Sequence, residues 1–329
     1  MKGNSRKVTV REVARAAGVS PGTVSRVFNA RGYLSAEIRR RVIEAARRTG
    51  YRFKRRSIAV IVSQNPDFHG YSGESLSAVL EELNRRNFLA EILPIGSLPL
   101  LVEHQLSGAV ALVLDNGLER IWAENWNLPM VCFQTVSRHR DNIYIVGSDN
   151  RQGIHLALNY LREQGHEKIG YVSWYATENF AERDNPDYML RKELYLDWCG
   201  EQLPYTVEAA EELDRALAGG CTAFLVVGES NELQFLHELI RRGLRVPEDI
   251  SVIAFERSIS PLLNPPMTTI GQQFPLLAAA ALGMLENLIS RREQAHDVRL
   301  PYVLNERGSV RRRLPDVDQG SPNLSGPTR

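Results

Sequence analysis

The sequence predicts an α/β protein in which a small three-helix unit precedes a larger, two-lobed unit of parallel sheets flanked by helices. In residues 58–314, short apolar runs alternate with segments of helical periodicity, which is the pattern of a parallel sheet covered by helices. Residues 1–51 contain only short helical patterns. The chain has 329 residues, about twice a typical domain length. We therefore expect a first unit (1–51), a short basic linker (52–57), a second unit (58–314) and a disordered tail (315–329).

Charge separates the same two parts of the chain. Residues 1–57 hold 16 Lys and Arg against 3 Asp and Glu, a net charge of +13. The remaining residues hold 24 basic and 36 acidic side chains, a net charge of −12. A basic unit joined to an acidic body predicts a polyanionic partner for the first unit alone. Charge by itself is equally compatible with a basic surface that only contacts solvent.

Several classes of protein are excluded by composition and motifs. No apolar run approaches the roughly 18 residues that a membrane helix needs, and no apolar segment follows the charged amino terminus, so no secretory signal is expected. Three widely separated cysteines, Cys132, Cys199 and Cys221, suit a reducing cytosol and argue against a disulfide framework or a zinc site. Nucleophile elbows, phosphate-binding loops and metal triads are lacking. We expect a cytoplasmic protein that is no enzyme and needs no cofactor.

The three helices of the first unit are predicted from their start and stop signals. The first opens at a capping box, Thr9–Glu12, and ends at Gly18. Ser20–Pro21 is an N-cap followed by proline at the first helical position, and it starts the second helix. The third helix begins at Ser35 and ends at Gly50. Apolar residues at helical spacing form the expected core: Val10, Val13, Ala14, Ala17, Val24, Val27, Phe28, Ile38, Val42, Ile43, Ala45 and Ala46.

Two short helices joined by a tight turn containing glycine, with a third helix that completes the core, form a helix-turn-helix pattern. The second helix is the candidate for the major groove of DNA. An arginine pairs with a guanine edge, while hydroxyls and amides contact phosphates. Its exposed side carries Ser20, Thr23, Ser25, Arg26 and Asn29. A three-helix module that binds another protein is the alternative, and the net charge of +13 disfavours it.

The runs Val8–Ser20 and Thr23–Asn29 strongly resemble the DNA-binding headpiece of the lactose-repressor (LacI/GalR) family. The resemblance implies that five residues mainly position the DNA backbone: Thr9, Ser20, Thr23, Ser25 and Asn29. It implies base reading by Arg26 and by the two residues after Ser20. Those two are Pro21 and Gly22, which carry no polar side chain, so direct readout is expected to depend on Arg26, with Tyr33 as a further contact.

The linker departs from the family. The resemblance implies about a dozen and a half residues between the Gly-Tyr pair and the first strand, including a short helix that wedges an apolar side chain into the minor groove. Here only residues 52–57 separate Tyr51 from the strand expected at Ile58. We expect Lys54 and Arg55 to lie along phosphates or in a minor groove, and DNA to be bent less than is usual. Alternatively, the second unit simply starts late and holds the headpieces rigidly.

Eight apolar runs are the expected strands of the second unit: Ile58–Val62, Ala90–Leu93, Ala109–Leu114, Met130–Phe133, Ile143–Val146, Ile169–Ser173, Ala223–Val227 and Ser251–Phe255. Four segments have helical periodicity: Leu76–Asn87, Asn150–Gln164, Arg191–Gly200 and Leu233–Arg242. Asp149 reads as a helix cap rather than a catalytic carboxylate. Ligands of such folds bind at the carboxyl ends of strands, and a cleft between the lobes is the expected pocket.

Residues 147–153, 161–172, 243–256 and 265–270 resemble the same family, which implies a periplasmic-binding-protein-like sensor that dimerises side by side. The resemblance assigns effector contacts to Arg191 and Glu256, and Glu229 occupies the place of a usual Asn-Asp pair. Trp174 is expected to stack on a sugar ring. Weaker effector candidates are Gln64, His69 and Gln272. Alternatively, Glu256 forms an ion pair with Arg257, and Trp174 packs in the core.

The leading hypothesis is a homodimeric repressor whose operator affinity is controlled by a sugar or sugar derivative. The tail has no leucine heptads, so no tetramer is expected. The departures in the pocket leave a second hypothesis: a DNA-binding regulator whose second unit only dimerises. A pure solute-binding protein is a third hypothesis, which the missing signal peptide and the intact headpiece disfavour.

Overall fold

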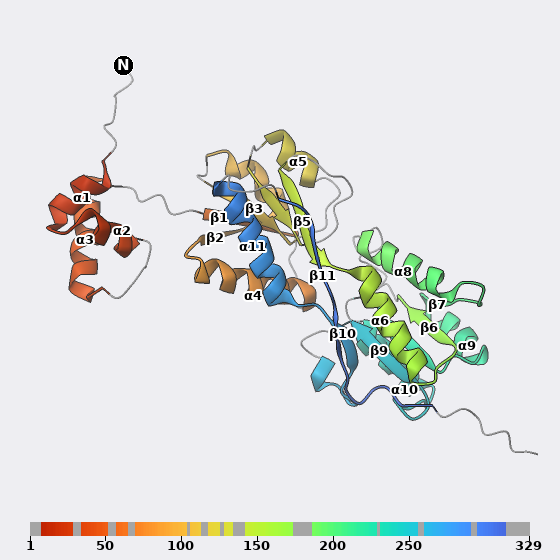
Figure 1. Ribbon diagram of the computed structural model, residues 1–329. Coiled ribbons are helices and arrows are strands. Elements are labelled where there is room, and N and C mark those ends of the chain that lie inside the picture. Colours follow the sequence, from red (N-terminus) through yellow and green to blue (C-terminus); the bar gives the residue numbers. More distant parts are fainter. Residues whose placement is uncertain are drawn as a thin grey trace, which may run out of the picture. The chain divides into compact units, whose positions relative to one another are not determined.

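The computed structural model describes residues 8–28, 34–51, 57–64, 70–103, 106–112, 118–125, 128–133, 142–173, 186–228, 231–255, 260–290 and 295–313. Three helices come first, and alternating strands and helices follow (Figure 1). The chain divides into two compact units: unit 1 is Met1–Gly147 with Phe274–Val298, and unit 2 is Ser148–Gln273 with Arg299–Arg329. The chain therefore crosses between the units three times.

The headpiece helices are α1 (Val10–Ala17), α2 (Pro21–Phe28) and α3 (Ala36–Thr49). The predicted capping box is confirmed, because the Glu12 amide donates to Thr9 Oγ1 at 3.4 Å and the Thr9 amide donates to Glu12 Oε2 at 2.7 Å. The predicted core is confirmed apart from Ile43, which is 37% exposed, and α1, α2 and α3 each contribute buried valine or alanine side chains. Local start and stop signals are therefore sufficient to place all three helices.

The turn between α1 and α2 requires glycine and an arginine from α3. Gly18 has a φ of 61°, in the left-handed region that disfavours other residues. A Cβ at this position would lie 2.9 Å from Arg41 Nη2. Arg41 Nη2 donates to the Ala17 carbonyl at 2.8 Å, and Arg48 Nη2 donates to the Ala16 carbonyl at 3.5 Å. These two cations occupy the negative end of α1, where they stabilise the turn that orients α2.

Unit 1 contains a six-stranded sheet in the order β11-β5-β4-β3-β1-β2. Its strands are β1 (Ser57–Val62), β2 (Leu89–Pro94), β3 (Leu106–Ala111), β4 (Met130–Cys132), β5 (Ile143–Ser148) and β11 (Val298–Leu300). The pairings among β1 to β5 are parallel. Strand β1 is buried along its whole length, as expected for the interior of a parallel sheet, and it begins one residue before the predicted start.

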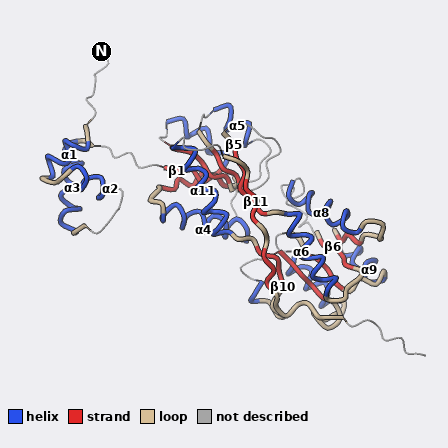
Figure 2. The backbone as a smooth tube through the Cα atoms, viewed as in Figure 1, coloured by secondary structure: helices blue, strands red, loops and turns tan. Residues whose placement is uncertain are grey.

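Helices lie on both faces of the unit 1 sheet (Figure 2). Helix α5 (Leu118–Asn125) and the 3-10 segment η1 (Ile95–Glu103) pack on one face. Helices α4 (Gly70–Arg85) and α11 (Phe274–Ser290) pack together on the other face. Arg86 joins these two helices, since its Nη1 donates to Glu286 Oε2 at 2.8 Å.

Unit 2 contains a second six-stranded sheet in the order β12-β10-β9-β8-β6-β7. Its strands are β6 (Ile169–Val172), β7 (Tyr205–Val207), β8 (Ala223–Val226), β9 (Ser251–Phe255), β10 (Thr268–Gly271) and β12 (Val303–Asn305). Neighbouring strands of this sheet are parallel, except that β10 and β12 are antiparallel. Every predicted strand overlaps an observed one, but β7, β10, β11 and β12 were missed, as were α5, α9 and α11.

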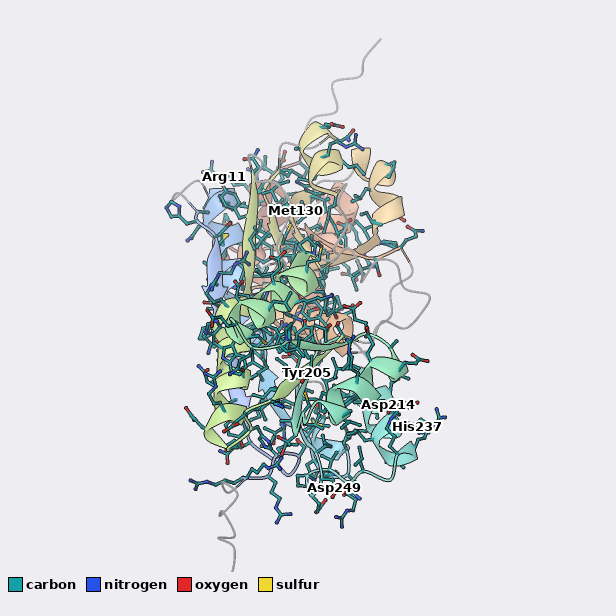
Figure 3. The ribbon with its side chains drawn as sticks, turned by 90° about the vertical axis from the view of Figure 1, so that its right-hand side faces the viewer. Arg11, Met130, Tyr205, Asp214, His237 and Asp249 are labelled. Carbon is teal, nitrogen blue, oxygen red and sulfur yellow. The ribbon has the colours of Figure 1, made fainter. Side chains whose placement is uncertain are left out.

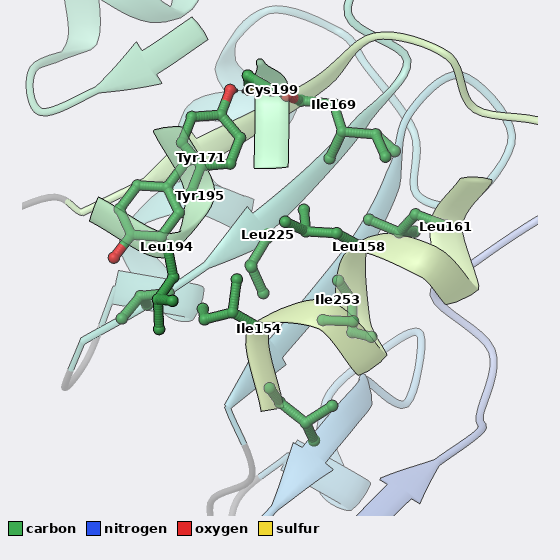
Figure 4. Packing of buried hydrophobic residues seen from close by; sticks show 14 of the residues in the cluster. Ile154, Leu158, Leu161, Ile169, Tyr171, Leu194, Tyr195, Cys199, Leu225 and Ile253 are labelled. Atoms are coloured by element: carbon green, nitrogen blue, oxygen red, sulfur yellow. Dashed lines mark hydrogen bonds between the residues drawn. The ribbon is translucent and has the colours of Figure 1, made fainter. Parts of the chain in front are cut away.

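The unit 2 sheet separates two hydrophobic clusters. Helices α6 (Asn150–Glu163) and α8 (Pro186–Cys199) cover one face, where Tyr171 stacks on Tyr195 with ring centroids 5.0 Å apart (Figure 4). Helices α9 (Ala210–Ala218) and α10 (Asn231–Arg241) cover the other face. Polar residues such as Asp214, His237 and Asp249 are exposed on the outside of this unit (Figure 3). Both faces of the sheet are therefore occupied, which leaves the strand ends for a site.

His166 fastens the last described segment of the chain to the unit 2 sheet. Its Nδ1 lies 2.9 Å from Thr222 Oγ1, and its Nε2 lies 3.1 Å from the Arg311 carbonyl. A carbonyl cannot donate, so Nε2 carries the proton and Nδ1 accepts from the threonine. Burial lowers the pKa of His166, the Arg311 carbonyl opposes this, and the charge of Arg313 adds to it.

Unit 2 should therefore lose stability on mild acidification. The unfolded state binds a proton near pH 6.5 and the folded state only below that value, so the His166 contribution is complete above pH 6.5 and declines below it. The slope cannot exceed about 1.4 kcal/mol per pH unit for one group. Thermal melts at pH 7.5 and 5.5 measure it. His166→Gln should reduce the difference and the exposed His237→Gln should retain it; equal slopes in both variants would contradict the assignment.

Candidate functional site

Helix α2 presents a polar row at its exposed first two turns. Ser20, Thr23 and Arg26 are spaced three residues apart, so they lie along one side of the helix. The Thr23 amide donates to Ser20 Oγ at 3.0 Å, and the two hydroxyl oxygens are 2.9 Å apart. Arg26 Nη2 donates weakly to Thr23 Oγ1 at 3.5 Å. The hydroxyls are thus engaged in capping, whereas the exposed guanidinium has most of its donors available for a base edge.

The first turn of α2 also carries Pro21 and Gly22, both exposed. A Cβ at Gly22 would meet only Ser20 Oγ at 3.7 Å, an ordinary contact. The fold therefore does not require glycine here, in contrast to Gly18. Of the other predicted DNA contacts, Thr9 belongs to the capping box and Ser25 is exposed on α2. Four lie outside the described residues: Asn29, Tyr33, Lys54 and Arg55.

A buried polar cluster lies in unit 2, among helices and strands that include the segments next to the points where the chain passes between the units. Helix α6 begins directly after the first crossing, and Asp149 caps it by accepting from the Gln152 amide at 3.1 Å, which confirms the predicted cap. Asn150, the first residue of α6, is buried. Its Nδ2 donates to Asp187 Oδ1 at 2.8 Å, and its Oδ1 accepts from Arg191 Nε at 2.8 Å. Asp187 and Arg191 are four residues apart on one face of α8.

Tyr302 and Phe255 complete the surroundings of the Arg191 guanidinium. Arg191 Nη2 donates to the Tyr302 hydroxyl at 2.9 Å. The guanidinium carbon lies 4.2 Å from the Phe255 ring centroid, in a cation–π contact. Gln272 Nε2 donates to the Tyr302 hydroxyl at 3.2 Å. We call Asn150, Asp187, Arg191, Phe255, Gln272 and Tyr302 the Arg191 cluster.

Arg191 and Tyr302 keep their usual ionisation states at neutral pH. Burial lowers the pKa of Arg191, but Tyr302 and Asp187 raise it, and the net direction is upward. Burial raises the pKa of Tyr302, and this outweighs the opposing effect of the Arg191 charge. Arg191 therefore stays a cation, and Tyr302 keeps the proton that it donates. The cluster offers guanidinium, amide and hydroxyl groups beside an aromatic face.

Two of the sequence-predicted effector residues, Arg191 and Gln272, belong to this cluster. Gln64 lies in unit 1, where its Oε1 accepts from the Gly96 amide at 2.8 Å. Four lie outside the described residues: His69, Trp174, Glu229 and Glu256. Sequence reasoning missed Asn150, Asp187, Phe255 and Tyr302. The helix-start signal at Asp149 pointed to the neighbourhood of Asn150, but nothing local to Tyr302 indicates a site.

Two family descriptions match the chain. Residues 9–53 match "Bacterial regulatory proteins, lacI family", and residues 158–310 match "Periplasmic binding protein-like domain". The chain belongs to the lacI family of bacterial regulatory proteins. As such it is a DNA-binding transcriptional regulator with a helix-turn-helix headpiece and a periplasmic-binding-protein-like domain, which confirms the family and fold predicted from the sequence.

Curated relatives of this lacI-family regulator span nearly its whole length. The HTH-type transcriptional repressor PurR of Pasteurella multocida is 26% identical over 337 aligned residues, with 93% of this chain and 99% of the relative covered. The ribose operon repressor of Bacillus subtilis is 27% identical over 330 residues, with 92% and 99% covered. Both alignments therefore cover nearly the full length of this chain and of the relative.

Solved structures show the same lacI-family fold. The complex of the transcriptional regulator CelR with cellobiose has a TM-score of 0.62 at 24% identity, covering 92% of this chain and 100% of that chain. The lac repressor dimer bound to operator and the anti-inducer ONPF has a TM-score of 0.66 at 22% identity, covering 93% and 100%. Among the described residues, no helix combines the length and apolar character needed to cross a bilayer.

Proposed function

We propose that this lacI-family regulator is a repressor whose operator affinity is controlled by a neutral sugar bound at the Arg191 cluster. We also propose that it acts in the cytoplasm as a homodimer and catalyses no reaction. The observation that carries the effector proposal is the buried guanidinium of Arg191, held by Asn150 and Tyr302 against the Phe255 ring. A fixed guanidinium beside an aromatic face suits vicinal hydroxyls and the apolar side of a sugar ring.

The charge of the cluster favours a neutral ligand. Among the described residues, its charged side chains are one guanidinium, Arg191, and one carboxylate, Asp187, both of them buried. A phosphate would add up to two negative charges to a desolvated site whose charges already balance, and this is costly. A neutral sugar adds only hydroxyls, which hydrogen-bond in either direction. Solved structures of this fold hold cellobiose, ribose and D-xylulofuranose.

Dimer formation is supported by the edge of the unit 1 sheet. Strand β2 is the terminal strand of that sheet, and its Leu89 and Ile92 side chains are 40% and 44% exposed. Apolar side chains on an unpaired edge strand are usually covered by another element or chain. A second copy of the chain is the proposed cover, because an operator with two half-sites is read by two headpieces.

A second candidate function has an observation of its own. Arg191 already uses its Nε and Nη2 groups inside the protein. A cluster whose polar groups already hydrogen-bond to one another is also expected in a domain that binds no effector. In that case the regulator would bind DNA constitutively, and unit 2 would only support the dimer.

Fluorescence anisotropy decides between these two functions. The full-length protein is titrated onto a DNA site selected from a random pool, with and without cellobiose, D-ribose, D-xylulose, glucose and their phosphates. A neutral sugar is expected to move the midpoint at least tenfold, which corresponds to about 1.4 kcal/mol of coupling, while phosphates have no effect. Tight DNA binding that no compound alters would establish the scaffold function, and a response confined to phosphates would contradict the charge argument.

A further inference from the structure

Three polar side chains of unit 2 stand beside the three crossings between the units. The crossings are at Gly147–Ser148, Gln273–Phe274 and Val298–Arg299. Asn150 follows the first, Gln272 precedes the second and Tyr302 follows the third, each within four residues. The first and third crossings are also tied by the backbone, because the Asp149 amide donates to the Leu300 carbonyl at 2.8 Å.

The Tyr302 hydroxyl joins all of these side chains to Arg191. It donates to Asn150 Oδ1 at 3.1 Å, and it accepts from Gln272 Nε2 at 3.2 Å and from Arg191 Nη2 at 2.9 Å. A phenolic hydroxyl has one donor and two acceptor positions, so these three bonds use its whole capacity. The hydroxyl therefore connects Arg191 to Gln272, and it adds a second connection to Asn150 beside the direct bond from Arg191 Nε.

The Tyr302 ring is held as firmly as its hydroxyl. It meets the Phe255 ring edge to face, with centroids 5.4 Å apart and planes at 89°. A Cβ at Gly153, in the first turns of α6, would lie 2.5 Å from Tyr302 Cδ2, so the ring fills the space that the glycine leaves. The backbone amide of Tyr302 donates to Gln152 Oε1 at 2.8 Å. With ring and backbone fixed, the hydroxyl has one position, and a change of partner must be made by Arg191, Asn150 or Gln272.

We propose that Tyr302 is the positioning residue that couples Arg191 to the three crossings. This inference rests on the proposed function, in which Arg191 binds a sugar. A sugar hydroxyl that takes the guanidinium competes with the Tyr302 hydroxyl for Arg191 Nη2. When that bond is exchanged, the hydrogen bonds of Tyr302 to Asn150 and Gln272 readjust, and the change reaches the segments beside the crossings. Tyr302 thus transmits occupancy of the site without itself being required for DNA contact.

Hydrogen–deuterium exchange of the full-length protein, with no sugar present, tests the link directly. Tyr302→Phe removes only the hydroxyl and keeps the ring. Amides in segments 143–151, 268–275 and 297–304 are expected to exchange about fivefold faster or more, because buried Asn150 and Arg191 and half-buried Gln272 each lose a hydrogen-bond partner. Tyr205→Phe is the matched control, since its hydroxyl donates to the Gly219 carbonyl at 3.3 Å outside the cluster. Unchanged exchange beside the first two crossings in Tyr302→Phe would overturn the proposal.

A second arm separates this inference from the proposed function. Operator titrations with cellobiose, D-ribose and D-xylulose compare the wild type with Tyr302→Phe. The sugar that moves the wild-type midpoint tenfold should still raise the variant's melting temperature but move its midpoint less than about threefold. A full shift in the variant would overturn the coupling role. If no sugar affects the wild type, the proposed function fails, and the exchange experiment still decides the link. Gln272→Met replaces Tyr302→Phe if the latter does not fold, with faster exchange expected in segment 143–151.

Discussion

Replacing Arg26 by alanine is expected to weaken binding to the selected DNA site by about 10- to 100-fold, the effect of losing one bidentate arginine–guanine contact. Arg26 is exposed on α2. The first two residues of that helix, Pro21 and Gly22, have no polar side chain that could also read bases. The side chain contributes nothing to the buried core of the headpiece. Fluorescence anisotropy on the selected site and on scrambled DNA measures the loss, which should be much smaller on scrambled DNA.

The control for Arg26→Ala is Arg39→Ala, on α3. Arg39 is equally exposed and has the same charge, so its removal takes away only general attraction to phosphates. We expect Arg39→Ala to weaken binding to the selected and the scrambled DNA equally. The salt slope should fall by about one at most, the effect of losing one phosphate contact. Equal losses for Arg26→Ala on the selected and scrambled DNAs would show that Arg26 contacts phosphate. Base readout would then come from residues 29–33, which include Asn29 and Tyr33.

Local chemistry explains why the headpiece could be predicted from the sequence. The starts of α1 to α3 and the ends of α1 and α3 are each determined by a residue within three positions, such as Ser35, whose Oγ accepts from the Ile38 amide at 3.3 Å. Glycine in the left-handed region ends α1 and α3. What could not be predicted is the role of Arg41, since its contact with Ala17 joins positions 24 residues apart. By composition alone it is one more basic residue of a DNA-binding unit.

The elements that sequence analysis missed depend on distant partners. Strands β11 and β12 have three residues each, too few for a periodicity to be visible, and they exist because β5 and β10 pair with them. Helix α11 is missed for a different reason. Its sequence, FPLLAAAALGMLENLIS, is apolar on nearly all sides, so the buried stripe that includes Leu277, Ala281 and Leu285 does not stand out.

The Arg191 cluster shows the same limit at the candidate site. Arg191 and Gln272 were predicted, one from a family resemblance and one as a weak candidate. Asn150 and Tyr302 are 152 residues apart in sequence, and only the crossing of the chain between the units brings them into hydrogen-bond distance. A tyrosine two residues after a short strand has no signal of its own. Its importance appears only when the number of partners of its hydroxyl is known.

Replacing Arg191 by methionine is expected to abolish every effect of sugars on operator affinity. Methionine retains an unbranched apolar stem beside Phe255 but cannot donate to Asn150, Tyr302 or a sugar hydroxyl. A buried carboxylate, Asp187, also loses the nearby positive charge. Asn150 Oδ1 and the Tyr302 hydroxyl each lose one of their two donors, although Tyr302 and Gln272 still donate to them. The lost bonds and the unbalanced charge of Asp187 should lower the melting temperature of unit 2 by several degrees. Operator affinity without sugar should change little, because the headpiece is untouched.

Lys192→Met is the matched control for Arg191→Met. Lys192 is the next residue of α8, carries the same charge and pairs with Glu208 at the half-exposed surface of unit 2. Its loss removes a surface ion pair, worth at most about 1 kcal/mol, and leaves the cluster intact, so the sugar response should remain. If Arg191→Met retains the sugar response, the effector binds elsewhere. If both variants lose the response, the sugar response depends on the integrity of α8 and not on the guanidinium itself. Loss in Arg191→Met alone would assign the response to the one cation that the Tyr302 hydroxyl holds.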